Sequence, residues 1–293
     1  MISQIIRRHV RITRAKIAMA KLLYRLTVLF TGPDKRIIVR RGIHYEVDPS
    51  EGLDLSMLLF GNFQRHVSRN SWVKIPKEGM ILDVGANVGF MSLQYAQLVP
   101  GGLVYAFEPT AYAYAKLKRN LSLNPELEAI VKPVQAFLSS GDGGDEVPTA
   151  YSSWRIDGSA KENLHPVHGG TPMPAGEVPV ITLDSFCAAE ALRRIDFIKI
   201  DTDGHEYAVL NGAVDILRRF RPAVILEIGL YIMEERGLNF GDYNSFFTRL
   251  GYELYNAANL KPVTPGNYMR RIPRWGTIDL LALPASESAE TGR

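Results

Sequence analysis

The sequence predicts a protein of the α/β class with a doubly wound, mostly parallel β-sheet. From residue 79 onward, short apolar segments alternate with segments of helical spacing, which is the order that βαβ units produce. Residues 79–86 and 195–201 are almost continuously apolar, as expected for strands buried on both faces. The 293 residues suffice for one large domain, and a composition of 46% hydrophobic and 22% charged residues is typical of globular proteins.

The predicted elements follow from local patterns. Residues 35–49 alternate and favour a strand pair, and residues 56–75 favour helix around a Gly-Asn turn. Turn-forming residues between 139 and 177 predict an insertion or lid, with a local hairpin at 149–156. Further strands are expected at 79–86, 102–109, 129–140, 195–201, 221–229, 252–258 and 276–284, and helices at 88–99, 110–124, 184–194, 204–220 and 242–251. Pro133 indicates an irregular or edge strand.

These patterns divide the chain into four parts. Residues 1–34 are expected to form a basic amphipathic helix, and residues 35–78 a β/α extension on the substrate side. Residues 79–284 form the main domain, which contains the insertion or lid at 139–177. Residues 285–293 are small and polar, and we expect a flexible tail.

The N-terminal segment holds most of the positive charge. The first 41 residues carry a net charge of +10, whereas the remainder carries −7, so an acidic body argues against nucleic acid as a partner. Charges interrupt every apolar run well short of the roughly 18 residues that a membrane span needs. On a helical projection, apolar and basic side chains take opposite faces. The apolar residues are Ile5, Ile12, Met19, Leu23, Leu26 and Phe30, and the basic ones are Arg7, Arg11, Arg14, Lys21 and Arg25.

Two partners suit this amphipathic helix. Its apolar face can pack on the body or on a second subunit, which would make a homo-oligomer. Alternatively, residues 1–30 lie on an anionic membrane surface. The only cysteine, Cys187, cannot form an internal disulfide and is expected to be a small apolar residue on a helix. We therefore expect a cytoplasmic protein, with a peripheral position at the inner face of the membrane as the alternative.

Ligands of doubly wound sheets bind at the carboxyl ends of the strands, so the residues after each strand are informative. The first such turn contains Asp83, Gly85, Asn87 and Gly89. A dinucleotide fingerprint would require glycine at 87, and a phosphate-binding loop would require a lysine. An acid before the turn suits a ligand with a cationic group better than a pyrophosphate. Glu108 follows the next strand, where a carboxylate can accept both hydroxyls of a ribose.

Ionisable side chains also gather after the later strands. Asp201, Asp203, His205 and Glu206 lie within six residues of one another, and Glu227 ends the next strand. Acids in turns are often solvated helix caps, but all of these fall at one predicted edge of the sheet. The edge is therefore a candidate reaction site.

Five segments in this order resemble FkbM-type S-adenosylmethionine-dependent methyltransferases: LDVGANVGF, VYAFEP, ITLDSF, IDFIKIDTDGHE and VLNGAVDILRRFRPAVILEI. The resemblance covers roughly residues 40–265. It implies a class I methyltransferase fold, a Rossmann-like seven-stranded sheet whose last strand is antiparallel. It also implies methyl transfer, usually to a hydroxyl oxygen of a natural product, sugar or lipid-linked glycan. Many relatives have Glu where this chain has Asp203, which leaves the role of that residue open.

The same resemblance implies a cofactor site for S-adenosylmethionine. Gly85, Asn87 and Gly89 are similar to its cofactor loop, Asp83 to the acid that supports the methionine end, and Glu108 to the ribose ligand. Ala136 and Phe137 are similar to the neighbours of the adenine, and we assign Asp201 to the cofactor site as well.

A hydroxyl acceptor benefits from a general base, and His205 is the leading candidate because histidine titrates near neutral pH. Lys199 and Asp201 are further catalytic candidates, with Lys199 pairing with Asp201 or Glu227 or polarising the acceptor. No metal is expected. The alternative is Mg²⁺ held by Asp201, Asp203 and Glu227 on a diol acceptor.

The acceptor is expected to be a small molecule, a glycan or a lipid-linked headgroup. Aromatic side chains of the lid are candidates for stacking on it: Tyr151, Trp154, His165 and His168. Two other functions remain as alternatives. One is a nicotinamide-dependent oxidoreductase, against which Asn87 argues, and the other is a catalytically silent, membrane-associated binding protein.

Overall fold

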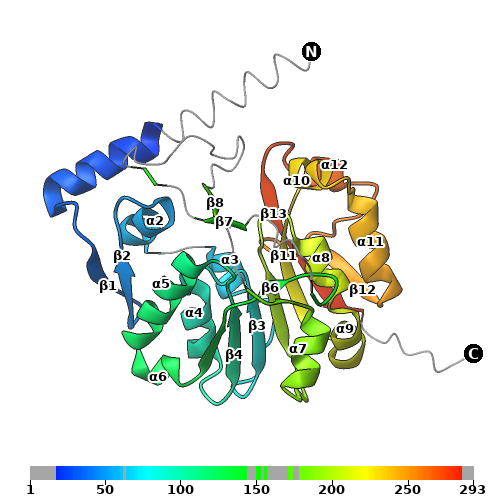
Figure 1. The fold of residues 1–293 in the computed structure, drawn as a ribbon. Helices are drawn as coiled ribbons and strands as arrows, with labels where there is room; N and C mark the ends of the chain where they lie inside the picture. Colours follow the sequence, from blue (N-terminus) through cyan, green and yellow to red (C-terminus); the bar gives the residue numbers. More distant parts are fainter. Residues whose placement is uncertain are drawn as a thin grey trace, which may run out of the picture.

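The computed structural model describes residues 18–61, 64–143, 150–152, 155–156, 171–173 and 178–285. Within these ranges a seven-stranded sheet is covered by helices on both faces (Figure 1). The strand order is β12-β13-β11-β10-β3-β4-β5, and β13 is antiparallel to both neighbours whereas the remaining pairs are parallel. The predicted α/β class and the antiparallel last strand are therefore confirmed. The strands are β3 (Met80–Val84), β4 (Leu103–Phe107), β5 (Val131–Val134), β10 (Phe197–Ile200), β11 (Ala223–Gly229), β12 (Tyr252–Asn256) and β13 (Thr277–Pro284).

Side-chain alternation in the strands builds a separate core on each face of the sheet. In β3, Leu82 enters the core shared with α7, α8, α9 and α11, whereas Ile81 enters the core shared with α4 and α5. The helices are α4 (Phe90–Leu98), α5 (Ala111–Ser122), α6 (Pro125–Glu128), α7 (Leu183–Ala189), α8 (Glu206–Asn211), α9 (Val214–Phe220), α10 (Leu230–Glu235), α11 (Phe240–Arg249) and α12 (Tyr268–Arg271). Cys187 is buried in α7, as expected for a small apolar residue.

Three local predictions are wrong, each for a visible reason. The strand expected at 129–140 is divided: β5 is an edge strand that contains Pro133, and the following β6 (Phe137–Leu138) leaves the sheet to pair with β9 (Val180–Ile181). The helix expected at 204–220 is broken at Gly212, where an added Cβ would lie 2.1 Å from the carbonyl oxygen of Ser139. Instead of a local hairpin at 149–156, β7 (Ala150–Ser152) pairs with β8 (Thr171–Met173).

Residues 35–78 pack on the α4 and α5 side of the sheet and complete its core. They contain β1 (Arg36–Arg40), β2 (Ile43–Val47), α2 (Gly52–Phe60) and α3 (Arg65–Ser68). Arg41 and Gly42 both have positive φ, at 55° and 79°, which suits the tight turn of the β1–β2 hairpin. The buried side chains of β2 join the same apolar core as α4 and α5.

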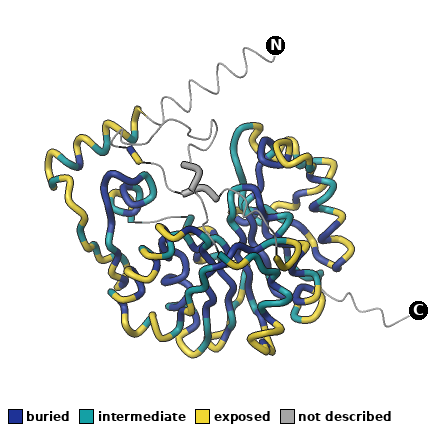
Figure 2. The backbone as a smooth tube through the Cα atoms, in the orientation of Figure 1, coloured by how far each residue is buried: buried dark blue, intermediate teal, exposed yellow. Residues whose placement is uncertain are grey.

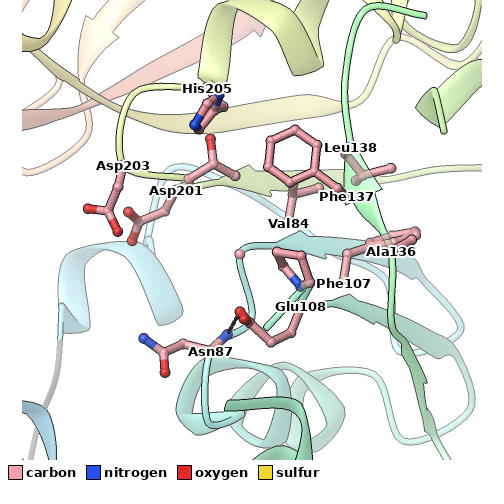
Figure 3. Close-up of a pocket in the computed structure, with 13 residues that line it drawn as sticks. Val84, Asn87, Phe107, Glu108, Ala136, Phe137, Leu138, Asp201, Asp203 and His205 are labelled. Carbon is pink, nitrogen blue, oxygen red and sulfur yellow. Dashed lines mark hydrogen bonds between the residues drawn. The ribbon is translucent and has the colours of Figure 1, made fainter. Parts of the chain in front are cut away.

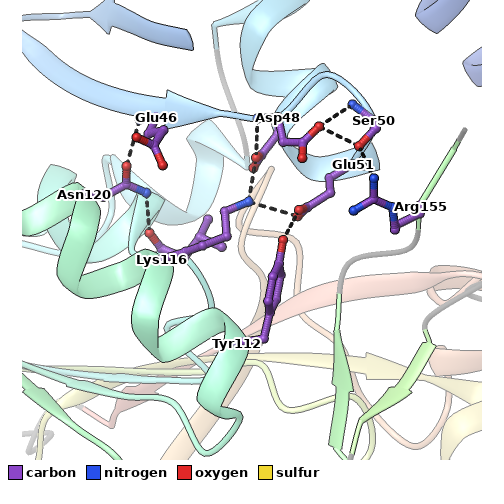
Figure 4. Close-up of polar contacts among 10 residues, drawn as sticks. Glu46, Asp48, Ser50, Glu51, Tyr112, Lys116, Asn120 and Arg155 are labelled. Atoms are coloured by element: carbon purple, nitrogen blue, oxygen red, sulfur yellow. Dashed lines mark hydrogen bonds and ion pairs between the residues drawn. The ribbon is translucent and has the colours of Figure 1, made fainter. Parts of the chain in front are cut away.

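A buried ion cluster fixes this extension to the main domain (Figure 4). The Lys116 ammonium on α5 lies 2.9 Å from Glu51 and 2.6 Å from Asp54, both at the start of α2. The Tyr112 hydroxyl, also on α5, donates to Glu51. Arg155 of the insertion donates to Ser50 at 3.0 Å, so the cluster joins the extension, α5 and part of the insertion.

Residues 18–31 form a helix at the N-terminal edge of the described chain, and residues 1–17 lie outside the described ranges. No helix among the described residues combines the length and the apolar character that crossing a membrane would require. Figure 2 shows that one side of this helix is exposed along its length. Of the predicted tail, only Ala285 is described.

Candidate active site

A pocket lies at the topological switch point of the sheet (Figure 3). The chain runs outward from β3 to β4 and β5, then returns to place β10 on the other side of β3. Ligands of doubly wound sheets bind where the strand order reverses in this way. The pocket is lined by Val84, Gly85, Asn87, Phe107, Glu108, Pro109, Ala136, Phe137, Leu138, Asp201, Thr202, Asp203 and His205.

The turn after β3 requires glycine at its first position. Gly85 has φ 75°, and a Cβ there would lie 1.8 Å from the carbonyl oxygen of Asp201. The backbone of this turn therefore passes directly against the end of β10. Asn87 has φ 50°, a left-handed conformation that asparagine tolerates better than most residues.

Glu108 joins the ends of β4 and β3 at the floor of the pocket. Its Oε2 accepts from the backbone N–H of Asn87 at 3.0 Å, and its Oε1 accepts from the backbone N–H of Thr110 at 2.9 Å (Figure 3). The carboxyl group is buried, which raises its pKa, while these hydrogen bonds act in the opposite direction. Because each carboxylate oxygen has more than one lone pair, Glu108 retains capacity to accept from a ligand hydroxyl.

Asp83 lies beneath the turn and outside the pocket. Its Oδ2 accepts from the Ser92 hydroxyl at 2.6 Å, and its Oδ1 lies 3.5 Å from the Lys199 ammonium. The predicted support of the methionine end by Asp83 stays a prediction, because its side chain is completely buried and does not line the pocket. Its contacts instead hold the base of the turn in place.

Lys199 occupies the centre of this buried network. Its ammonium donates to the carbonyl of Gly85 at 2.9 Å and lies 3.6 Å from Asp201. Burial disfavours the charged form, but the carboxylates of Asp201 and Asp83 outweigh burial and raise the pKa of Lys199. A lysine with a raised pKa keeps its proton, and these contacts give Lys199 a positioning role under the turn. Its predicted role in polarising the acceptor stays a prediction.

Three carboxyl groups converge beside the pocket. Asp201, Asp203 and Glu227 each place one oxygen so that all three lie within 4.8 Å of one another. Burial and the neighbouring Asp201 carboxylate raise the pKa of Asp203 to about 8 and that of Glu227 to about 9. At neutral pH this site therefore holds protons. A bound cation would displace them, and carboxylate oxygens are ligands that Mg²⁺ accepts.

His205 lies at the start of α8 with its ring against Phe137, at a centroid separation of 5.1 Å (Figure 3). Its Nε2 lies 3.2 Å from the Arg236 guanidinium. Arginine has only donors, so Nε2 accepts this hydrogen bond and the neutral ring carries its proton on Nδ1. Arg236 is exposed, and its displacement would make the Nε2 lone pair available.

The structure brings most of the predicted ligand-binding residues together. Six of them line the pocket: Gly85, Asn87, Glu108, Ala136, Phe137 and Asp201. Gly89 does not line the pocket. A Cβ at this position would lie 2.4 Å from the Leu117 side chain, so glycine makes room for Leu117. Among the lid residues, Tyr151 is described only as part of β7, and Trp154, His165 and His168 lie outside the described residues.

Two residues that shape the site, Asp279 and Arg236, were not predicted from the sequence. Asp279 on β13 is the register partner of Glu227, and its charge contributes to raising the pKa of Glu227. The sequence does contain a sign of Asp279, because it is the one acid within the otherwise apolar segment TIDLLALP. His66 of the extension contacts Asp279. Arg236 was not predicted because it lies far along the chain from His205 and follows no strand.

Residues 83–254 match the sequence profile of the methyltransferase FkbM domain. This match covers more than half of the chain. The chain belongs to the FkbM methyltransferase family. The matched range runs from Asp83 near the end of β3 to Leu254 in β12, so it contains every residue that lines the pocket.

Individual relatives of this FkbM methyltransferase are distant. The methyltransferase sdnD of Sordaria araneosa is 30% identical over 163 residues, covering 47% of this chain and 61% of the relative. The 2-O-methyltransferase NoeI of Sinorhizobium fredii is 27% identical over 152 residues, covering 48% of this chain and 60% of the relative. The chain thus spans about three fifths of the length of these curated relatives.

Among the solved structures that are similar to this chain, one carries the name of this family. It is the methyltransferase FkbM of Methylobacillus flagellatus, which is 17% identical, with a TM-score of 0.46, over 73% of this chain and 46% of that one. Family membership of this chain rests on the sequence match and not on this likeness.

Proposed function

We propose that this methyltransferase uses S-adenosylmethionine to methylate a hydroxyl oxygen of a small molecule, a sugar or a lipid-linked headgroup. The observation that supports the proposal most is the hydrogen bond from the Asn87 backbone N–H to Glu108. It holds a buried carboxylate beside the turn that begins at Gly85, where the carboxylate could accept from ribose hydroxyls. The name of the relative NoeI, a 2-O-methyltransferase, favours oxygen as the acceptor atom.

The residues of the pocket fit this cofactor. Gly85 and Asn87 line the pocket at the turn after β3, where the methionine part would lie, and Glu108 would accept from ribose hydroxyls. Ala136 and Phe137 offer an apolar surface to the adenine. The cofactor supplies an electrophilic methyl group, so the protein has to orient the acceptor, exclude water and receive a proton.

We assign the proton-accepting role to His205. It lines the same pocket as Glu108, next to the carboxyl groups at the end of β10. Its Nε2 becomes a base when Arg236 moves away, which an incoming acceptor hydroxyl could bring about. A metal-assisted variant, with Asp201, Asp203 and Glu227 holding Mg²⁺, predicts loss of activity in EDTA and recovery with Mg²⁺. Full activity in EDTA would rule that variant out.

A methyl-transfer assay that presupposes no particular acceptor tests the proposal. Purified protein is incubated with cofactor labelled at the methyl group and with extract fractions separated by polarity. We expect label in a product whose methyl group resists mild base but is located on oxygen by mass fragmentation. Label on nitrogen or carbon would refute O-methylation, and an absence of label in every fraction, with cofactor bound, would count against hydroxyl acceptors of these classes. The matched control is Glu108→Ala, which should transfer no label.

A further inference from the structure

The N-terminal edge of the molecule carries an apolar surface that the described part of the chain leaves uncovered. On the helix of residues 18–31, Leu29 is 75% exposed and Phe30 is 81% exposed. We call the following set the N-terminal apolar surface: Met19, Leu22, Leu26, Leu29 and Phe30 of the helix, and Ile37 and Val39 of β1. Contiguous exposed apolar patches of this kind mark interaction sites.

The geometry of the helix explains why these side chains stay outside. Residues at a spacing of three or four share one face, and Thr27, which is buried, occupies the face that rests on the body. Leu22, Leu26 and Leu29 project on the opposite half of the helix, and Met19 and Phe30 flank them on one side. Four residues separate the end of the helix from β1, and both lie at the same edge of the molecule (Figure 1). The helix and the strand thus contribute to one side.

Positive charge surrounds this apolar surface. Residues 18–41 contain six Lys or Arg and a single acid, Asp34. Lys21 and Arg25 are exposed on the helix next to its apolar stripe, and Lys35 and Arg41 are exposed at the two ends of β1. A protein partner whose surface carries both signs of charge would not require this excess of positive charge. An anionic bilayer matches both features, because acyl chains accept the apolar side chains and lipid phosphates accept the cations.

The position of the surface relative to the pocket agrees with a membrane role. The helix of residues 18–31 lies at the end of the molecule toward which the carboxyl ends of β3 and β4 point (Figure 1). We infer that the N-terminal apolar surface docks this protein on an anionic lipid bilayer, with the carboxyl edge of the sheet turned toward the lipid. Docking of this kind does not depend on which cofactor or acceptor the pocket binds.

Vesicle co-sedimentation of the full-length protein tests this inference. The probe is a vesicle of phosphatidylcholine with about 30% phosphatidylglycerol, compared with pure phosphatidylcholine. We expect binding to the anionic vesicles only. The triple variant Leu26→Gln/Leu29→Gln/Phe30→Gln should lower the bound fraction about tenfold or more. Lys21→Glu/Arg25→Glu should do the same, whereas Arg218→Glu/Arg219→Glu on α9, at the opposite edge of the sheet, should bind as the parent does.

Two kinds of result would overturn the inference. One is that the parent protein stays in the supernatant, or that the triple variant sediments equally well. The other is that the parent protein is a dimer in the absence of lipid whereas the triple variant is a monomer. The surface would then be an interface between two copies. Since all the substituted side chains are exposed, an unchanged melting temperature and unchanged binding of S-adenosylhomocysteine confirm that each variant is folded.

Discussion

Lys199 and Asp83 face each other across the β10–β3 pair as register partners, and the Lys199 ammonium lies 3.5 Å from Asp83 Oδ1. Both residues are buried, and the same ammonium donates to the carbonyl of Gly85. The charge pair therefore sits under the turn that forms the pocket floor, and its role is to fix that turn.

Removing one member of this pair should be far more costly than removing both. Lys199→Met leaves the buried Asp83 without its cation and should lower the free energy of unfolding by about 3–5 kcal/mol. Adding Asp83→Asn should restore part of this loss. Urea unfolding of the two single variants and the double variant measures the coupling. A coupling energy below about 0.5 kcal/mol would show that the pair does not act as a unit.

Gly85 should tolerate no side chain. Gly85→Ala combines a positive φ with a Cβ that would lie 1.8 Å from a backbone oxygen, so we expect a loss of about 3 kcal/mol of stability and loss of cofactor binding. Gly101→Ala is the matched control, because its nearest neighbour would be at 3.6 Å and its φ is not positive. If the two variants unfold at the same urea concentration, the result contradicts the close contact between the turn and the end of β10.

The fold could be predicted from sequence because the strand-helix alternation and the apolar strands determine it locally. Three of the residues that line the pocket could also be predicted, since Gly85, Asn87 and Glu108 follow strands directly. The burial of Asp83 beneath the turn could not be predicted, because one strand residue earlier or later decides whether a side chain faces the pocket or the core. The contact between His205 and Arg236 depends on the packing of α8 against the end of α10, which no local pattern contains.

Stability should fall as the pH rises through the range in which the carboxyl cluster titrates. The native state holds a proton on Asp203 up to a pKa of about 8, whereas the unfolded chain loses it near the ordinary value of 3.8. Between these values the native state binds more protons than the unfolded state, so this group stabilises the native state most at low pH and progressively less toward pH 8. Glu227, with a pKa raised to about 9, acts in the same direction.

Asp203→Asn checks this pH dependence, because asparagine has no proton to lose. We measure the free energy of unfolding in urea at pH 5 and at pH 9. Between these pH values, we expect the variant's free energy of unfolding to rise by about 1–2 kcal/mol relative to that of the parent. Asp215→Asn, on the exposed side of α9, should give no such change. A parallel pH dependence of the parent and Asp203→Asn would contradict the raised pKa of this group.

His205→Gln should reduce methyl transfer without removing cofactor binding. The glutamine cannot accept the proton of a hydroxyl acceptor, so we expect kcat to fall by about 100-fold or more. His44→Gln, at an exposed position of β2, is the control and should behave as the parent. The rate is measured with the acceptor found in the labelled-cofactor assay. Unchanged kcat in His205→Gln would assign the proton to another group.

Calorimetric titration of the full-length protein with S-adenosylhomocysteine tests the central claim most directly. We expect saturable binding of one ligand per chain and no binding of NAD. In Glu108→Gln we expect a loss of affinity of at least about tenfold, because a neutral amide accepts ribose hydroxyls less well than a carboxylate. Glu128→Gln, on the exposed helix α6, should bind as the parent does. Failure of the parent to bind S-adenosylhomocysteine, or binding of NAD in its place, would contradict the account.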